Sequence, residues 1–278
     1  MKIGFIDYFL DEWHANNYPT WIKEHSNGTM EVAYAYGKIA SPHSGMTSEE
    51  WCREHGVQLC ETIAEVVEKS DALVVLSPDN CEMHEELCRL PFASGKPTFV
   101  DKTFSPDLAT AKRLFALAEA NGTPCYTTSS LRYADEYADV KTDDISSICC
   151  WGSGDVDGYS VHMLEPLMML MKAPAEKVFI TKNDEWYQLL IAFADGRRGS
   201  IAGWKPWTSY RTNVKHTGEC QEIAVESDFF QPFIAALVKF FNDRIVPVSH
   251  EETLAIMAVR DAAMQALATP ETWVAVPQ

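Results

Sequence analysis

Short apolar runs alternate with helix-like segments over the first half of the chain. The runs predicted to form strands are Lys2–Tyr8, Met30–Tyr36, Leu73–Ser77, Pro97–Val100 and Pro124–Thr127. The helices predicted between them are Ser48–Glu54, Ile63–Lys69, Cys81–Ala93 and Pro106–Asn121. Because strands that alternate with helices form parallel βαβ units, we predict an α/β domain built on a doubly wound parallel sheet.

The pattern changes after residue 127, where strands follow one another directly. The strands predicted there are Ile145–Trp151, Val178–Lys182, Tyr187–Phe193, Gly199–Trp204 and Gln221–Glu226. The helices predicted there are Val161–Met171, Phe229–Asn242 and Glu251–Ala268. Successive strands favour a largely antiparallel sheet, and hence a C-terminal α+β domain. The predicted domains are 1–127 and 128–278, with the last helices able to pack back on the first domain.

Ligands of a doubly wound sheet bind beyond the carboxyl ends of its strands. The loops expected at that edge are Asp7–Tyr18, Tyr36–Thr47, Ser77–Asn80 and Asp101–Ser105. Lys102 follows the fourth predicted strand and would therefore point toward a ligand. Its ammonium could hydrogen-bond a substrate oxygen and stabilise negative charge that develops there. The alternative is a surface lysine that pairs with Asp101.

Composition and charge narrow the class of protein. The chain has 278 residues, 46% apolar and 23% charged, which suits a globular protein of two domains. Its net charge of −17 argues against a nucleic-acid partner. We expect no signal peptide and no membrane span, because no apolar stretch approaches about 18 residues. The eight cysteines form no Cys-x-x-Cys pair, which predicts reduced thiols in a cytoplasmic protein.

Several short motifs resemble the glucose–fructose oxidoreductase / inositol dehydrogenase / MocA (Gfo/Idh/MocA) family. In that family a strand ends in a Thr-Pro-Asn-like turn, a helix carries a histidine, and the next strand ends in Glu-Lys-Pro. The corresponding residues here are Ser77-Pro78-Asp79-Asn80, His84, Asp101-Lys102-Thr103, the Arg-bearing segment Ser129–Tyr133, and the helix residue His162. The two C-terminal helices are also similar to those of the family, so the resemblance covers nearly the whole chain.

The resemblance implies a Rossmann-like first domain and an NAD(P)-dependent oxidoreductase that acts on CH–OH groups of a sugar, cyclitol or related polyol. Lys102 and His162 would be catalytic, His162 because imidazole titrates near neutral pH. The residues assigned to NAD or NADP are Asp7, Tyr8, Lys38, Ser77, Pro78, Asn80 and Asp101. Those assigned to the carbohydrate-like substrate are Arg132, Tyr133 and Glu165, although each could be structural. We also expect a homo-oligomer.

The first βα loop departs from the family pattern. A dinucleotide fold needs glycines there so that the backbone can approach the pyrophosphate, but no glycine occurs between Phe5 and Ala15. The second strand also ends without the acidic residue that binds an adenosine ribose. The family's aspartate four residues before His162 is Gly158 here. The alternative is therefore a protein that has lost the nicotinamide and acts as a ligand-binding or regulatory protein or a non-redox enzyme.

Three smaller groups of residues each have a functional and a structural interpretation. Asp7, Asp11 and His14 could bind a metal or simply begin a solvated helix. Cys81, His84 and Cys88 have a spacing that zinc could use, although helix packing explains it more simply. The aromatic residues around Tyr210 suit a sugar ring or an oligomer contact; they are Trp204, Trp207 and Tyr210, with Arg211 beside them.

Overall fold

The computed structural model describes residues 1–278 and divides the chain into two compact units. The first unit comprises Met1–Thr128 with Gln231–His250, and the second comprises Ser129–Phe230 with Glu251–Gln278. The first unit's N-terminal segment ends at Thr128, one residue beyond the predicted boundary. Most of the helix Phe230–Asp243 (α8) belongs to the first unit.

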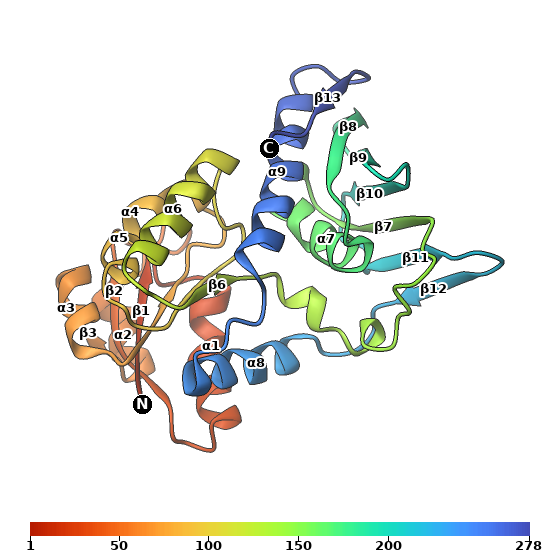
Figure 1. Cartoon of the computed structure of the whole chain (residues 1–278). Helices are drawn as coiled ribbons and strands as arrows, with labels where there is room; N and C mark the ends of the chain where they lie inside the picture. Colours follow the sequence, from red (N-terminus) through yellow and green to blue (C-terminus); the bar gives the residue numbers. More distant parts are fainter. The chain divides into compact units, whose positions relative to one another are not determined.

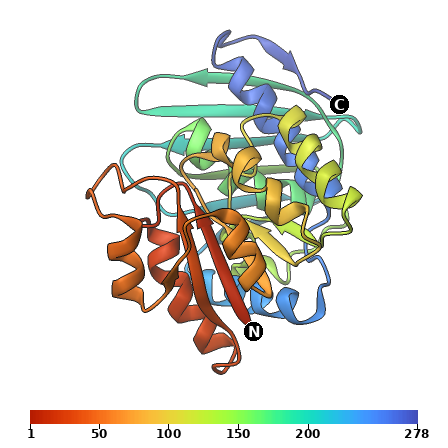
Figure 2. The same ribbon diagram turned by 90° about the vertical axis from the view of Figure 1, so that its left-hand side faces the viewer.

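A six-stranded parallel sheet forms the centre of the first unit, in the order β3-β2-β1-β4-β5-β6 (Figures 1 and 2). Its strands are β1 (Lys2–Asp7), β2 (Glu31–Gly37), β3 (Gln58–Leu59), β4 (Ala72–Val75), β5 (Thr98–Val100) and β6 (Cys125–Thr127). Its long helices are α1 (Trp13–His25), α2 (Ser48–His55), α3 (Ile63–Lys69), α6 (Leu108–Ala120) and α8. All four residues of β4 are buried, as expected for a sheet covered on both faces. The predicted Rossmann-like sheet is confirmed.

Two helices of this unit differ from the prediction. Helix α1 begins at Trp13, inside the segment predicted to be a loop, because Glu12 caps its first turn. The helix predicted over Cys81–Ala93 consists instead of three short turns, η1 (Cys81–Met83), α4 (His84–Leu87) and α5 (Arg89–Phe92). Pro91 has no N–H with which to continue a regular helix through this segment.

The second unit is built on a seven-stranded sheet in the order β12-β11-β7-β10-β9-β8-β13. Its strands are β7 (Ser147–Ser153), β8 (Ala175–Lys182), β9 (Trp186–Phe193), β10 (Arg198–Trp204), β11 (Arg211–Lys215), β12 (Cys220–Ala224) and β13 (Trp273–Ala275). Only the β7–β10 pair is parallel, so the largely antiparallel sheet is confirmed. The helices are α7 (Val156–Met171) and α9 (His250–Ala266). Strands β11 and β13 were not predicted.

Helix α7 begins at Val156 rather than at the predicted Val161. Asp155 caps it, because its carboxylate accepts the Gly158 N–H at 2.9 Å. The buried face of α7 includes Val161, Leu164 and Met168. The extra first turn brings Asp155 and Asp157 into the helix start rather than leaving them in a loop.

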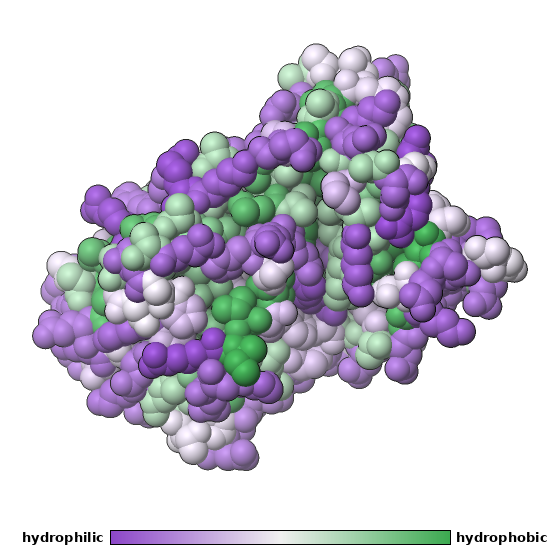
Figure 3. Space-filling model, in the orientation of Figure 1, coloured by the Kyte–Doolittle hydropathy of each residue, from purple (hydrophilic) through white to green (hydrophobic).

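The face of the molecule seen in Figure 3 is hydrophilic over most of its area, with smaller hydrophobic patches among the polar residues. That distribution agrees with the high proportion of acidic residues in the sequence. None of the helices combines the length and the apolar character that crossing a membrane requires.

Candidate active site

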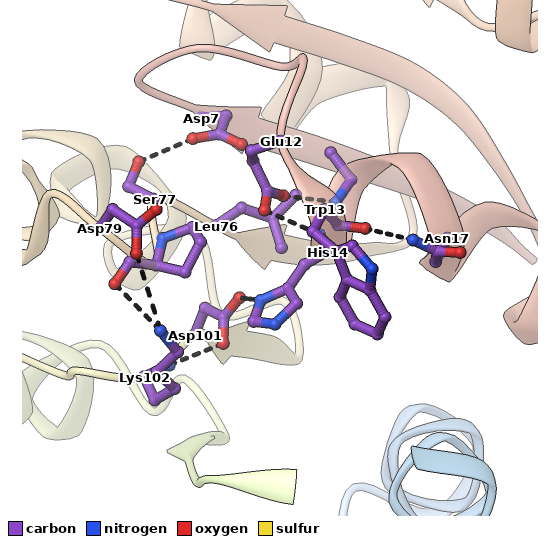
Figure 4. Close-up of polar contacts among 12 residues, drawn as sticks. Asp7, Glu12, Trp13, His14, Asn17, Leu76, Ser77, Asp79, Asp101 and Lys102 are labelled. Carbon is purple, nitrogen blue, oxygen red and sulfur yellow. Dashed lines mark hydrogen bonds and ion pairs between the residues drawn. The ribbon is translucent and has the colours of Figure 1, made fainter. Parts of the chain in front are cut away.

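The carboxyl ends of β1, β4 and β5 bring together a group of polar side chains in the first unit (Figure 4). The strands are aligned so that Ile6 pairs with Val75, and Val75 pairs with Val100. The residues that follow these positions therefore meet at one edge of the sheet. They are Asp7, Ser77, Asp101 and Lys102.

Lys102 lies at the end of β5 and is only 8% exposed. Its Nζ donates to the Pro78 carbonyl at 3.3 Å and lies 4.0 Å from Asp79 Oδ1. Its backbone N–H donates to Asp101 Oδ1 at 2.7 Å, which anchors the turn. The ammonium is thus directed to the end of β4, and the side chain is buried rather than at the surface.

Asp101 pairs instead with a histidine from α1. His14 Nδ1 and Asp101 Oδ2 form a short ion pair that joins the start of α1 to the end of β5. Burial opposes the charged imidazolium, but the Asp101 carboxylate outweighs it and raises the pKa of His14. The ring also stacks on Tyr18, with 5.0 Å between the centroids. This pair was not predicted from the sequence.

Glu12 was also not predicted as a site residue, and it is the N-cap residue immediately before α1. Its two carboxylate oxygens accept the backbone N–H groups of His14, at 2.7 Å, and of Ala15. Burial, with added repulsion from Asp7, raises the pKa of Glu12 to about 8. The amides at this helix start therefore donate to a side-chain carboxyl group, at a position that the oxygens of an external anion could otherwise take.

Asp7, at the end of β1, is completely buried. Its Oδ1 accepts the Ser77 hydroxyl at 2.8 Å and the Tyr8 N–H at 2.6 Å, while Oδ2 has no hydrogen-bond partner. Burial raises the pKa of Asp7 to about 8, although both hydrogen bonds oppose the shift. At neutral pH this side chain is therefore mostly a neutral carboxylic acid.

Replacing Asp7 with Asn should flatten the pH dependence of stability. The raised pKa means that the folded protein keeps a proton that the unfolded chain loses above its usual value of 3.8. The free energy of unfolding of the wild type should therefore fall as the pH rises from about 4 to about 8. Asn cannot ionise, so Asp7→Asn should gain about 2 °C or more in Tm over the wild type at alkaline pH.

Thermal unfolding between acidic and alkaline pH measures this effect. Asp139→Asn makes the same chemical change at an exposed position and should follow the wild-type curve. Parallel curves for the wild type and Asp7→Asn would contradict the assignment of the raised pKa to this side chain.

The other cofactor residues assigned from the sequence have contacts of their own. Lys38 forms an exposed ion pair with Glu86 at 2.6 Å. The Asn80 side chain donates to Glu82 at 3.0 Å. Pro78 supplies the carbonyl that Lys102 contacts. None of these contacts tests a bound cofactor, so the assignments stay predictions.

Neither metal interpretation has a matching geometry. No group of three or more His, Cys, Asp or Glu side chains is arranged to hold a metal ion. Asp11 accepts the Ser44 hydroxyl at 2.5 Å, and His14 pairs with Asp101. His84 is buried with its nitrogens 2.6 Å from the Leu76 carbonyl and 3.0 Å from the Phe104 carbonyl. His84 therefore links β4 to the segment after Lys102, in keeping with the packing interpretation.

In the second unit, His162 lies half-buried on α7. Its Nδ1 is hydrogen-bonded to Ser129 Oγ at 2.7 Å. Neither nearby aspartate replaces the family's carboxylate: Asp155 caps α7, and Asp157 is bound by the buried Arg260. The Ser129 hydroxyl is thus one group that orients the His162 ring.

Arg132 and Glu165 are paired with each other in the same unit. Arg132 Nη1 lies 2.9 Å from Glu165 Oε2, and Nη2 forms a short ion pair with Glu252. Glu165 also accepts the Ser129 N–H at 3.1 Å. The neighbouring Tyr133 is largely buried, and burial raises the pKa of its phenol. These contacts suit a structural role, and the assignment of the three residues to substrate stays a prediction.

Three tryptophans of the second unit lie on strands β7, β9 and β10 and line one groove. A groove of about 330 Å³ is lined by Trp151, Trp186 and Trp204. Trp207 is 70% exposed and lies edge-on to Tyr210 with 5.8 Å between the ring centroids. A sugar ring or another protein chain could cover such a face, and both interpretations stay predictions.

Comparison with known proteins gives one family match. Residues 21–129 match the family model GFO_IDH_MocA, described as an oxidoreductase family with an NAD-binding Rossmann fold. The match begins within α1, after the turn that Glu12 caps. No curated protein matches the sequence.

Solved structures with the same fold extend over nearly the whole chain. GenD2 from gentamicin A biosynthesis, in complex with NAD, has a TM-score of 0.82 at 14% identity and covers 100% of this chain and 97% of its own. A scyllo-inositol dehydrogenase from Lactobacillus casei, with NAD(H) and scyllo-inositol, has a TM-score of 0.80 at 14% identity (99% and 98% covered). A probable dehydrogenase from Thermotoga maritima has a TM-score of 0.79 at 13% identity (99% of each chain). At these identities the likeness establishes the fold.

Proposed function

We propose that the chain is an NAD(P)-dependent oxidoreductase that oxidises a CH–OH group of a sugar, a cyclitol or a related polyol, because residues 21–129 match the model of the Gfo/Idh/MocA oxidoreductase family. Lys102 carries the proposal, because it is a largely buried ammonium at the carboxyl end of β5. Support for the substrate class comes from the similar structures, two of which hold NAD and one of which also holds scyllo-inositol.

Two features of the first unit fit a dinucleotide. The amides at the start of α1 already donate to the carboxyl oxygens of Glu12, so they are placed to donate to the oxygens of a phosphate. The ends of β4 and β5 present Ser77, Pro78 and Asp101 beside Lys102, where we propose that the nicotinamide half binds. The alternative of a protein that has lost the nicotinamide finds no support in the family match.

A nicotinamide held at the ends of β4 and β5 would supply the hydride acceptor for this oxidation. Lys102 donates a hydrogen bond to the oxygen of the substrate hydroxyl. It stabilises the negative charge that develops on this oxygen as the hydroxyl proton leaves. Its contact with the Pro78 carbonyl limits the positions that the flexible side chain can take. Lys102 thus orients the hydroxyl and polarises it.

We propose His162 as the group that accepts the hydroxyl proton. The hydrogen bond between Ser129 and Nδ1 fixes the imidazole ring, and proton transfer is assigned to Nε2. His162→Asn should lower kcat by about 10²-fold or more. Ser129→Ala should lower kcat less, because the ring stays present but loses its orienting partner. A steady-state assay with NAD or NADP and a panel of polyols measures both effects, and an unchanged kcat for His162→Asn would remove this residue from the mechanism.

A further inference from the structure

We propose that the Glu12 side chain acts as an internal competitor for the anion site at the start of α1, so that a dinucleotide pyrophosphate binds there only by displacing it. The inference rests on the proposed function and adds a control of cofactor affinity to it. Glu12 would then be a specificity-determining residue of this chain.

The contacts of Glu12 are those that a bound anion would make. Helix α1 has 13 residues, and both oxygens of the Glu12 carboxylate accept N–H groups of its first turn, those of His14 and Ala15. A helix start attracts anions through these free amides and through the helix dipole. With both amides engaged and the side chain only 9% exposed, an external phosphate cannot use them until Glu12 moves.

A second observation places a ligand beside this helix start. Asp7 is completely buried, and its Oδ2 has no hydrogen-bond partner. Figure 4 shows the Asp7 carboxyl facing Glu12. A neutral carboxylic acid can donate to a phosphate oxygen, and burial raises the pKa of Asp7 to about 8, which keeps it mostly neutral at pH 7. Asp7 therefore offers a donor to a phosphate once Glu12 has moved.

The chain between β1 and α1 explains why the side chain can enter. Dinucleotide folds keep this turn glycine-rich, so that no side chain lies between the helix start and the pyrophosphate. Here residues 8–12 are Tyr-Phe-Leu-Asp-Glu, without a glycine. Glu12 is the residue immediately before α1, with an extended backbone that turns its side chain back over the first turn.

The test compares wild type, Glu12→Gly and Glu24→Ala for binding of NADH and of inorganic pyrophosphate, by calorimetry at neutral pH. Glycine removes the carboxylate and is tolerated at a helix N-cap. Glu24→Ala removes a glutamate side chain from an exposed position of the same helix and should bind like the wild type. Glu12→Gly should bind NADH at least about tenfold more tightly than the wild type, and should bind pyrophosphate measurably.

The outcomes separate the two proposals. Equal NADH affinity in the wild type and Glu12→Gly would overturn the role of Glu12 and leave the proposed function standing. Pyrophosphate binding to Glu12→Gly without NADH binding to any variant would support the role of Glu12 and sink the nicotinamide function. If Glu12→Gly does not fold, as judged by circular dichroism, Glu12→Ser keeps a capping hydroxyl and takes its place. Failure of the folded variant to bind either probe would overturn the inference.

Discussion

Replacing Lys102 with Ala should lower kcat by at least about 10²-fold, and by more if the ammonium provides most of the charge stabilisation. The Lys102 ammonium donates to the Pro78 carbonyl and lies 4.0 Å from Asp79 Oδ1, and we expect the fold to survive removal of this side chain. The anchoring contact between the Lys102 N–H and Asp101 is made by the backbone and is retained in the variant. The loss should therefore appear in turnover and not in the far-ultraviolet circular dichroism.

Two further variants serve as controls for Lys102→Ala. Lys69→Ala removes an exposed lysine of the same unit, one that pairs with Glu65 on helix α3 and is assigned to neither the cofactor nor the substrate, and it should keep most of the wild-type turnover. Lys102→Arg keeps the charge but changes the shape of the donor, so it should recover only part of the rate. A wild-type rate in Lys102→Ala would show that the strand-end lysine takes no part in the reaction.

Replacing Arg132 with Leu should destabilise the second unit by about 3 kcal/mol or more. The guanidinium lies between two carboxylates, and the side chains of Arg132 and Glu165 are 9% and 5% exposed. Removing the arginine leaves Glu165 buried without its counter-charge, which costs far more than an exposed ion pair contributes. Urea unfolding followed by tryptophan fluorescence measures the change.

An exposed arginine provides the comparison for Arg132. Arg113 pairs with Glu85 at 2.6 Å, but the two side chains are 56% and 48% exposed. Arg113→Leu should therefore cost less than about 1 kcal/mol. Similar unfolding midpoints for the two variants would mean that the Arg132 cluster is solvated and contributes little.

The strand-and-helix rhythm was sufficient to predict the parallel sheet and the place of Lys102. Both depend on local patterns: buried apolar runs identify the strands, and a residue just after a parallel strand must lie at the ligand edge. Helix α1 was not predicted because it contains Asn16, Asn17 and Pro19, which have low helix propensity. Its formation depends on the Glu12 cap and on burial of Tyr18 and Ile22.

The ion pair between His14 and Asp101 could not be predicted from local sequence patterns. Asp101 and His14 are 87 residues apart in the chain, and only the folded sheet brings them together. The start of helix α7 was predicted five residues too late, at Val161 instead of Val156. Its first turn depends on a cap by Asp155, which the spacing of apolar residues does not reveal. Strand β11 was missed because it is short and polar and buries only Thr212 and Val214.

Calorimetric titration of the wild-type chain with NADH and with NADPH tests the central claim most directly. The account predicts saturable binding of at least one of the two, at one molecule per chain, with an affinity weakened by the Glu12 carboxylate at the start of α1. It would be contradicted if neither dinucleotide bound at millimolar concentration to the wild type or to Glu12→Gly.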